Sequence, residues 1–276
     1  MRLVTYDAGQ GPRVGLLRDD EVVEVNAPSL RALLEAGPLD GLETGAATPL
    51  ANVSLLPPIP DPGKLICIGL NYRSHAEEGG VEAPDTPTFF AKFANALVPD
   101  GTPVPMPAYS KKVDYEAEVA FVIARRAKDV PEEDALDYIA GYTLLNDLSA
   151  RDYQFMTPQW MPGKVFDGSA PCGPALVTPD EAGAHNAIEI RLTLNGEVMQ
   201  SDSTAGLVHS IPVLLAYLSK LMTLEPGDIV STGTPAGVGS VKQPRVWLKP
   251  GDDIVIDSPT LGTLRTSMGE PVLENK

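Results

Sequence analysis

Short runs in which apolar and polar residues alternate recur along the chain, and this pattern is typical of half-buried β-strands. Near the N-terminus, such runs cover residues 4–6, 13–17 and 21–25. Turns rich in Gly or Asp separate them. A short apolar run covers 64–69, and an alternating run at 188–194 ends in Asn195-Gly196, a dipeptide typical of hairpin turns. The pattern therefore predicts a strand-rich α+β fold.

Helix signals fall in fewer segments. Residues 29–36 lie between a plausible N-cap serine and a glycine that can end a helix. Residues 131–140 open with Pro and acidic side chains, which are favoured in a first helical turn. Residues 210–222 are mostly apolar after a Ser-Ile-Pro start, so we expect a buried helix there.

A cluster of prolines at 57–62 interrupts both patterns. Proline blocks helices and central strands, so this segment predicts a stiff connector between two domains. We therefore expect a small β-rich N-terminal domain over 1–56, a linker over 57–63 and a larger domain over 64–276. Within the larger domain, a long loop at 79–87 carries Gly, Pro and acids, and loops of that length are often functional lids.

The formal net charge of −16 limits the classes of ligand. A nucleic-acid-binding face needs clustered Lys and Arg, so we expect no nucleic-acid partner. The chain as a whole would also repel an anionic small molecule. A site that accepts such a molecule must therefore be locally positive.

The apolar runs and the cysteines bear on where the protein resides. No apolar run approaches the length of a membrane span, and the first residues lack the apolar core of a signal peptide. Cys67 and Cys172 match no metal or redox spacing, and we expect both to be small buried side chains. These features predict a cytoplasmic protein with no membrane partner.

Two glutamates, Glu116 and Glu118, interrupt an otherwise apolar run at 113–123. Side chains alternate faces along a strand, so both carboxylates would point the same way. Two neighbouring anions repel, and taking both out of water is costly unless a cation compensates. The pair therefore indicates either a cation site or, as the plainer alternative, the solvated face of an edge strand.

Asp147 supports the first interpretation, because it ends a predicted strand that starts near Gly141. The helix expected at 131–140 would make a strand–helix–strand excursion that could return Asp147 beside the glutamate pair. Three carboxylates with no Cys or His favour Mg²⁺, Mn²⁺ or Ca²⁺ over Zn²⁺. Such a site would leave room for water and a chelating substrate.

Other candidate groups carry weaker signals. His75 and Glu78 would share a face of a helical turn, where the carboxylate could orient the imidazole as a general base; a surface turn is the plainer alternative. Lys164, bracketed by Pro and Gly, is either held near a buried anion or exposed in a loop. His185 has the surroundings of a loop residue. We expect His209, which precedes the last predicted helix, to be structural.

The glycine-rich segment at 232–239 follows an apolar strand. It lacks the Gly-Lys-Ser/Thr ending of a phosphate-binding loop, and Lys242 stands where a dinucleotide fingerprint needs its third glycine. The sequence leaves open another interpretation, in which backbone N–H groups of this segment form a cradle for a small anion. Ser149 and Ser231 lack a Gly-x-Ser-x-Gly context, which disfavours a serine hydrolase.

Several motifs taken in order resemble the fumarylacetoacetate hydrolase family. They lie at 69–78, 114–118, 146–154, 164–168 and 227–239. The resemblance implies a C-terminal domain folded as a mixed β-sandwich roll, a homodimer, and a lid over residues 76–87 that orders on ligand binding. The short N-terminal segment favours the bacterial-type branch, which acts on acylpyruvates and related small anionic 2-oxo acids.

The same resemblance implies roles for individual residues. Mg²⁺ or Mn²⁺, or Ca²⁺ in a crystal, would bind Glu116, Glu118 and Asp147, and the water-activating dyad would be His75 and Glu78. The substrate contacts would be Lys164 and Gln154 at the reacting part, Thr234 at the carboxylate end and, as a looser correspondence, Arg151.

We therefore predict hydrolysis of a carbon–carbon bond in a 2,4-dioxo acid, in which water activated by His75 attacks the distal carbonyl and an enolate leaves. Oxaloacetate decarboxylation and hydroxymuconate isomerisation also pass through an enolate but need no attacking water, and both stay open. A non-catalytic metal-stabilised scaffold or ligand-binding protein is the alternative from another class. Such a protein would not need His75, Glu78 and Lys164 together with the carboxylates.

Overall fold

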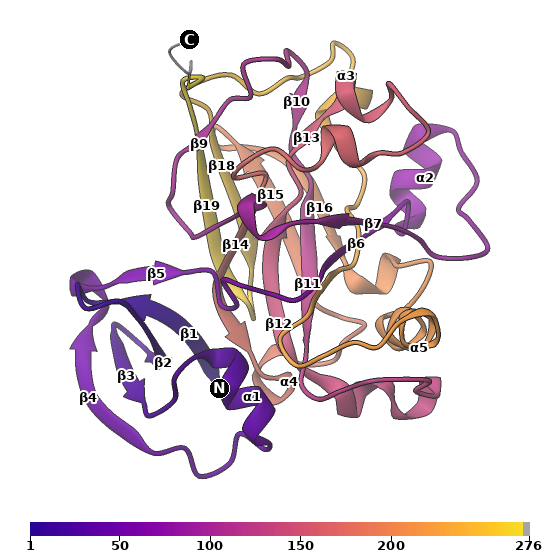
Figure 1. Ribbon diagram of the computed structural model, residues 1–276. Coiled ribbons are helices and arrows are strands. Elements are labelled where there is room, and N and C mark those ends of the chain that lie inside the picture. Colours follow the sequence, from indigo (N-terminus) through magenta and orange to yellow (C-terminus); the bar gives the residue numbers. More distant parts are fainter. Residues whose placement is uncertain (273–276) are drawn as a thin grey trace.

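Two β-sheets packed face to face form the centre of the fold over residues 1–272, the part of the chain that the computed structural model describes (Figure 1). The larger sheet has 12 strands in the order β4-β3-β2-β1-β14-β12-β11-β17-β6-β7, with β5 beside β1 and β8 beside β14. Its strands are β1 (Arg2–Asp7), β2 (Pro12–Arg18), β3 (Glu21–Val25), β4 (Thr44–Pro49), β5 (Ser54–Leu56), β6 (Leu65–Gly69), β7 (Thr88–Lys92), β8 (Leu97–Val98), β11 (Ala117–Ile123), β12 (Ile139–Asn146), β14 (Ala170–Val177) and β17 (Ile229–Ser231).

The second sheet has five strands in the order β16-β15-β18-β19-β9. They are β9 (Val104–Pro105), β15 (Glu189–Leu194), β16 (Glu197–Ser203), β18 (Asp253–Ser258) and β19 (Gly262–Gly269), and a small separate pair joins β10 (Val113–Asp114) to β13 (Ser149–Ala150). Antiparallel pairs dominate, but β17 runs parallel to β6 and β19 runs parallel to β9. The predicted strand-rich α+β fold of the mixed sandwich type is therefore confirmed.

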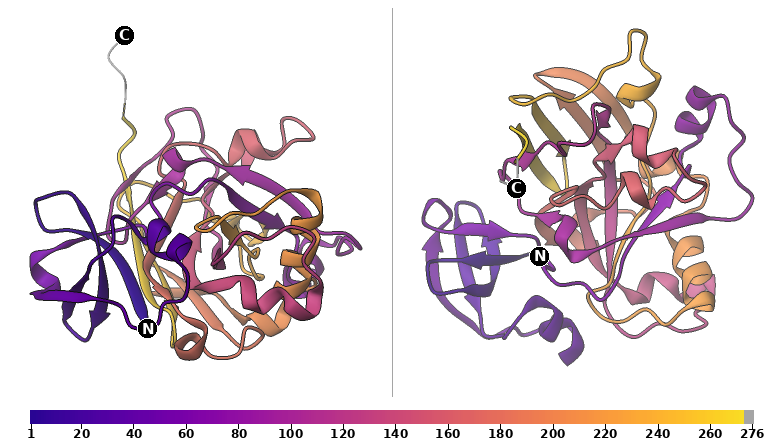
Figure 2. Two further views of the ribbon diagram at one scale, coloured as in Figure 1. Left: turned by 60° about the horizontal axis from the view of Figure 1, so that its bottom comes forward. Right: turned by 45° about the horizontal axis from the view of Figure 1, so that its top comes forward.

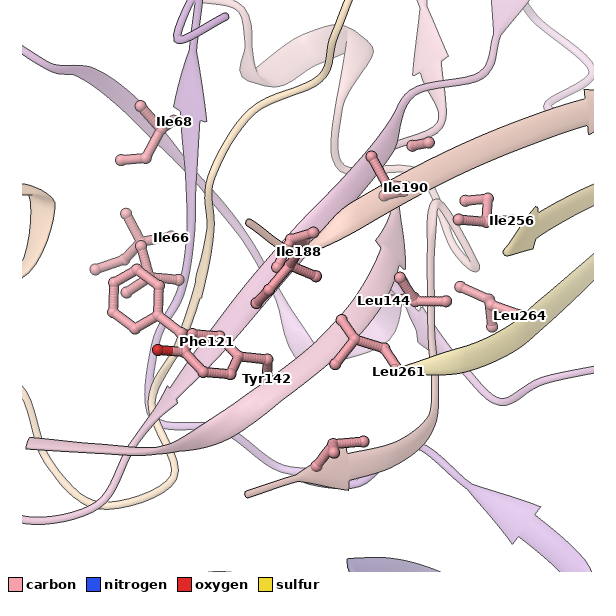
Figure 3. Packing of buried hydrophobic residues seen from close by; sticks show 14 of the residues in the cluster. Ile66, Ile68, Phe121, Tyr142, Leu144, Ile188, Ile190, Ile256, Leu261 and Leu264 are labelled. Carbon is pink, nitrogen blue, oxygen red and sulfur yellow. The ribbon is translucent and has the colours of Figure 1, made fainter. Parts of the chain in front are cut away.

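The main core lies between the two sheets. Strands β11, β12 and β14 of the larger sheet contact β15 and β19 of the second. Figure 3 shows Leu144 of β12 near Leu264 of β19 and Ile256 of β18, and each of these side chains is fully buried. Burying a side chain of this size contributes roughly 1.5–3 kcal/mol, so the sandwich gives β11 and β12 a rigid setting.

The N-terminal strands extend the larger sheet to one side (Figure 2). Strand β1 pairs with β14 through Leu3 and Leu176, so hydrogen bonds run without a break into the rest of the sheet. The expected N-terminal strands form as β1, β2 and β3, and the Asn195-Gly196 turn joins β15 to β16 as predicted. Residues 57–64 hold no helix or strand. The domain boundary at 57–63 stays a prediction.

The helices are short: α1 (Leu30–Ala36), α2 (Arg73–Gly79), α3 (Arg151–Gln154), α4 (Pro179–Ala182) and α5 (Ile211–Leu221). Two predicted helices are confirmed, since α1 starts after Ser29, whose hydroxyl accepts from Ala32 N, and α5 covers the expected apolar stretch. No helix of the described residues is long and apolar enough to cross a membrane.

The α-helix predicted at 131–140 is wrong in type and length. The segment forms the 3-10 helix η3 (Glu132–Tyr138), flanked by extended backbone at Pro131 and Ile139. Ile139 already pairs with Ile123 in the sheet, so the last two residues of the predicted helix belong to β12. The connection between β11 and β12 still returns the chain to the neighbouring strand.

Candidate active site

Three carboxylates meet where β11 begins and β12 ends. Ala117 pairs with Asn146, and Asp147 N donates to Glu116 O at 2.9 Å, so the two strand ends lie side by side. Oxygens from Glu116, Glu118 and Asp147 lie within 4.8 Å of one another. The predicted strand–helix–strand return of Asp147 is thus what the fold provides.

The solvated-edge alternative for the two glutamates is wrong. Strand β11 lies inside the sheet between β12 and β17, and every residue of it is buried. Glu116 and Glu118 are only 4% and 2% exposed. Anions this deeply buried require compensation from within the protein or from a bound cation.

Lysines and an arginine supply part of that compensation. Lys164 Nζ lies 2.6 Å from Glu116 and 2.7 Å from Asp147, and Arg151 Nη2 lies 2.6 Å from Glu116. Lys164 is therefore the buried lysine beside an anion, not the exposed loop residue. It follows Gly163, where an added Cβ would lie 2.5 Å from Ala150 O, so the close approach of the two backbones requires glycine.

Lys92 is a further member of the site that the sequence analysis did not single out. It ends β7 with a fully buried ammonium group, 2.6 Å from Asp147 Oδ1 and 3.2 Å from Leu148 O. A signal existed, because a strand that places Phe90 in the core places Lys92 on the same face two residues later.

The electrostatic balance differs between the two glutamates. Burial favours a raised pKa for Glu116, but the charges of Arg151 and Lys164 outweigh burial and hold that pKa well below its usual range. Burial raises the pKa of Glu118, and the neighbouring anions Asp147 and Glu116 raise it further. Glu118 is therefore the carboxylate that the protein's own cations compensate least.

This donor set fits a hard divalent cation. The three groups are carboxylates, which Mg²⁺ and Mn²⁺ prefer, and no thiol or imidazole completes the cluster among the described residues. Ser231 Oγ donates to Glu118 Oε2 at 2.5 Å and Gly233 N donates to the same oxygen at 3.1 Å, which fixes the carboxylate in place. A cation would relieve the excess negative charge that raises the pKa of Glu118.

His75 and Glu78 share a face of α2, as the sequence predicted. The His75 ring lines the same pocket as the carboxylates, but its Nδ1 is 3.8 Å from Glu78 Oε2, beyond hydrogen-bond distance. Both oxygens of Glu78 instead accept from Gly237 N, at 3.0 and 2.9 Å. Burial lowers the pKa of His75, which favours the neutral ring that a general base requires.

Arg151 and Gln154 lie at the pocket, and each guanidinium nitrogen of the arginine contacts a protein group. Its Nε donates to Asp114 Oδ2 at 2.9 Å, and its Nη1 donates to Gln154 Oε1 at 3.0 Å, besides the ion pair with Glu116. Arg151 therefore orients Gln154 and Glu116. Because the carbonyl of Gln154 accepts from Arg151, its NH₂ group is the end that can donate into the pocket.

The glycine-rich segment at 232–239 binds the protein's own carboxylates. Its N–H groups donate to Glu118, Glu78 and Asp114, so the small-anion cradle considered from the sequence serves internal anions. Thr234 lines the pocket, and its hydroxyl donates to Ala117 O at 2.9 Å and accepts from Gln200 at 2.8 Å.

The pocket has a volume of about 250 Å³. Its polar floor consists of the carboxylates and their partners, while its walls are largely apolar and include Ile68, Leu70, Val81, Phe90, Phe155 and Trp160. A wider hollow of about 610 Å³ lies against α1. Each of its four cations pairs with a carboxylate, which leaves the smaller pocket as the candidate active site; they are Arg31, Lys64, Arg125 and Arg126.

The chain matches known families and proteins over most of its length. The model of the fumarylacetoacetate hydrolase C-terminal family matches residues 64–268, and the Rv2993c-like N-terminal model matches residues 1–58. The chain is 41% identical over 284 residues to a mitochondrial oxaloacetate tautomerase of Xenopus laevis, with 96% of this chain and 89% of the relative covered.

Solved structures are similar over their whole length. A 2-hydroxyhepta-2,4-diene-1,7-dioate isomerase from Mycobacterium marinum is 32% identical with a TM-score of 0.84, and the match covers 100% of both chains. A maleylpyruvate hydrolase from Sphingobium sp. SYK-6, in complex with manganese(II) and pyruvate, is 30% identical with a TM-score of 0.80, covering 99% of this chain and 100% of the other.

Proposed function

Because the chain belongs to the fumarylacetoacetate hydrolase family, we propose that it catalyses enol chemistry on a small anionic 2-oxo acid at a site for Mg²⁺ or Mn²⁺. One observation carries the proposal: the buried set of Glu116, Glu118 and Asp147 faces the same small pocket as His75 and Gln154. A cation site alone would not need a buried imidazole beside it.

Each group has a distinct role in this proposal. A divalent ion bound by the three carboxylates would polarise the 2-oxo group of the substrate as a Lewis acid. Lys164 would stabilise negative charge that develops on a substrate oxygen, because its ammonium group is already held rigidly in the pocket. The NH₂ group of Gln154 would donate to the reacting part of the substrate, Thr234 would help to bind its carboxylate end, and His75 would transfer the proton.

The first candidate reaction is the keto–enol conversion of oxaloacetate. His75 would remove a proton from C3 of the keto form and, as the imidazolium, deliver that proton to the 2-oxo oxygen, and the reverse transfer would restore the keto form. The oxaloacetate tautomerase that is 41% identical over nearly the whole chain supports this choice. The apolar walls would keep bulk water from the reacting carbon.

The second candidate is hydrolysis of a carbon–carbon bond in a 2,4-dioxo acid. Here His75, with Glu78 nearby, would deprotonate a water that attacks the distal carbonyl. A specific observation favours it, since walls such as Val81, Phe155 and Trp160 suit the uncharged distal group of an acylpyruvate. The similar maleylpyruvate hydrolase supports the same reading, and oxaloacetate decarboxylation and hydroxymuconate isomerisation remain variants at the same site.

One set of assays separates these reactions. Purified protein with Mg²⁺ or Mn²⁺ is given oxaloacetate and, in parallel, acylpyruvates of graded length in ¹⁸O-labelled water. We expect faster keto–enol conversion of oxaloacetate than buffer with metal gives, and loss of the effect on chelation. Label in an acid product would assign hydrolysis, and release of CO₂ would assign decarboxylation. Absence of turnover on the whole panel would contradict the proposed function.

Two further properties stay predictions. A homodimer is expected from the family resemblance, and sedimentation of the purified protein would test it. The cytoplasmic location rests on the sequence alone, and the similar oxaloacetate tautomerase carries a mitochondrial designation.

A further inference from the structure

The segment that joins α2 to β7, residues 80–87, forms an outer wall of the pocket and is here named the α2–β7 loop. Gly79, just before it, and Val81, within it, line the pocket, and Val81 is 48% exposed on its other side. The ribbon shows this segment as an arc at the edge of the molecule, away from both sheets (Figure 1). An arc of this kind needs specific contacts to hold it over a pocket.

Backbone hydrogen bonds hold the start of the α2–β7 loop against the end of α2. Gly80 ends α2 in a left-handed conformation, and Val81 N donates to Ala76 O at 3.0 Å. One residue before the helix ends, Glu78 accepts from Gly237 N. These contacts fix the helix end but leave Glu82 and the residues after it without support from α2.

A histidine from a distant part of the chain holds the middle of the loop. His209 Nε2 lies 2.8 Å from the carbonyl oxygen of Pro84. A carbonyl only accepts, so Nε2 must carry the proton. Both the neutral tautomer protonated at Nε2 and the imidazolium form satisfy this contact, so either protonation state can make it.

Hydrogen bonds connect the backbone of His209 to the side of the pocket that carries the three carboxylates. Its N–H donates to Asn71 Oδ1 at 2.8 Å, and Asn71 Nδ2 donates to Thr232 O at 2.9 Å. Thr232 N donates in turn to Val119 O on β11, and Asn71 is 1% exposed. His209 thus connects the α2–β7 loop to the strand that carries Glu118.

We propose that His209 is a positioning residue that latches the α2–β7 loop over the pocket. Its kinetic consequence rests on the proposed function, because the loop would then retain substrate without taking part in the chemistry. Loss of the latch would raise KM, through faster escape of substrate, and leave kcat nearly unchanged. It would also free the backbone around the exposed Glu82 and so speed proteolysis there, and that readout needs no substrate.

The test compares substitutions at His209 with a matched control. H209A removes the donor, H209Q can place an amide donor near the position of Nε2, and H209N is too short to reach Pro84. H185A is the control, because His185 lies in a loop outside the pocket. Readouts are cleavage after Glu82 by a glutamate-specific protease, melting temperature, and KM and kcat for oxaloacetate with Mg²⁺.

We expect H209A and H209N to be cleaved faster after Glu82 and to raise KM about 3- to 10-fold, the range that loss of one hydrogen bond produces. H209Q and H185A should resemble the unchanged protein in both readouts. Should H209A fail to fold, the contrast between H209Q and H209N carries the test.

Equal cleavage of all variants would overturn the latch, as would a fall in kcat with no change in KM. If the protein turns over none of the substrates, the proposed function fails while the proteolysis still decides whether His209 holds the loop.

Discussion

At the scale of single residues, the site depends on how a few buried charges are paired. Lys164 lies within 2.7 Å of both Glu116 and Asp147, and Lys92 contacts the other oxygen of Asp147. Glu118, in contrast, is held by a hydroxyl and an N–H group. Removing either partner of a buried charge pair leaves the other uncompensated, so these residues act as a unit.

Replacing His75 with Ala should lower kcat by about 10²- to 10⁴-fold, the usual contribution of a positioned acid–base group. Metal affinity should stay unchanged, because His75 is not among the three clustered ligands. Steady-state kinetics and a Mn²⁺ titration measure the two quantities. Turnover that survives in H75A would show that another group transfers the proton.

The pH dependence of kcat/KM should reflect the lowered pKa of His75. Burial disfavours the charged ring, so the neutral form that accepts a proton persists below the ordinary value of 6.5. The acidic limb of the profile, measured with saturating metal, should therefore have its midpoint below 6.5. A midpoint above that value would exclude His75 as the base.

At the scale of elements, the short segment before Lys164 places its ammonium group. G163A should cost about 1–3 kcal/mol of stability, because the new Cβ would lie 2.5 Å from Ala150 O and from Gln154 N, which are backbone atoms that cannot rotate away. G45A is the control, since its nearest contact is 3.5 Å and it lies on an exposed strand. Denaturant unfolding measures both, and equal midpoints would contradict the account.

Elements whose signals lie within one segment could be predicted from sequence. The Ser29 cap of α1 and the Asn195-Gly196 turn are local, and both formed as expected. The end of helix η3 was not predictable from its own composition, because the pairing of Ile139 with Ile123 places the residues after Tyr138 in β12. Sheet register, a property of two strands, decided that outcome.

The candidate site also divides into residues with a local sequence signal and residues that only the strand order brings together. Glu116, Glu118 and Asp147 were predictable because alternation and one short excursion place them together. Alternation could have shown that Lys92 is buried, but not that Lys92 and Ser231 lie at this site, since strand order brings β7 and β17 there from distant parts of the sequence. Family resemblance supplied Lys164, whose own surroundings left two interpretations open.

At the scale of the whole molecule, the order of binding follows from charge. The chain has a net charge of −16, and its buried site holds more carboxylates than cationic side chains. The carboxylates are Asp114, Glu116, Glu118 and Asp147, and the cations are Lys92, Arg151 and Lys164. A divalent ion reverses the sign of that balance, so an anionic substrate should bind only after the metal.

Oxalate, which offers two neighbouring oxygens as a 2-oxo acid does, tests this order. We expect Mn²⁺ alone to raise the melting temperature, oxalate alone to leave it unchanged, and both together to raise it further. At 100 times its dissociation constant, oxalate should add about 2.7 kcal/mol of stability. Stabilisation by oxalate in the presence of a chelator would contradict the predicted order.

The central claim is that Glu116, Glu118 and Asp147 together bind one divalent ion. Anomalous diffraction at the manganese edge, from crystals grown with Mn²⁺, tests it most directly. The account predicts one peak in each chain, with an oxygen of each of the three carboxylates about 2.0–2.2 Å from the ion, as for similar hard cations. A peak elsewhere, or no peak at saturating Mn²⁺, would contradict it.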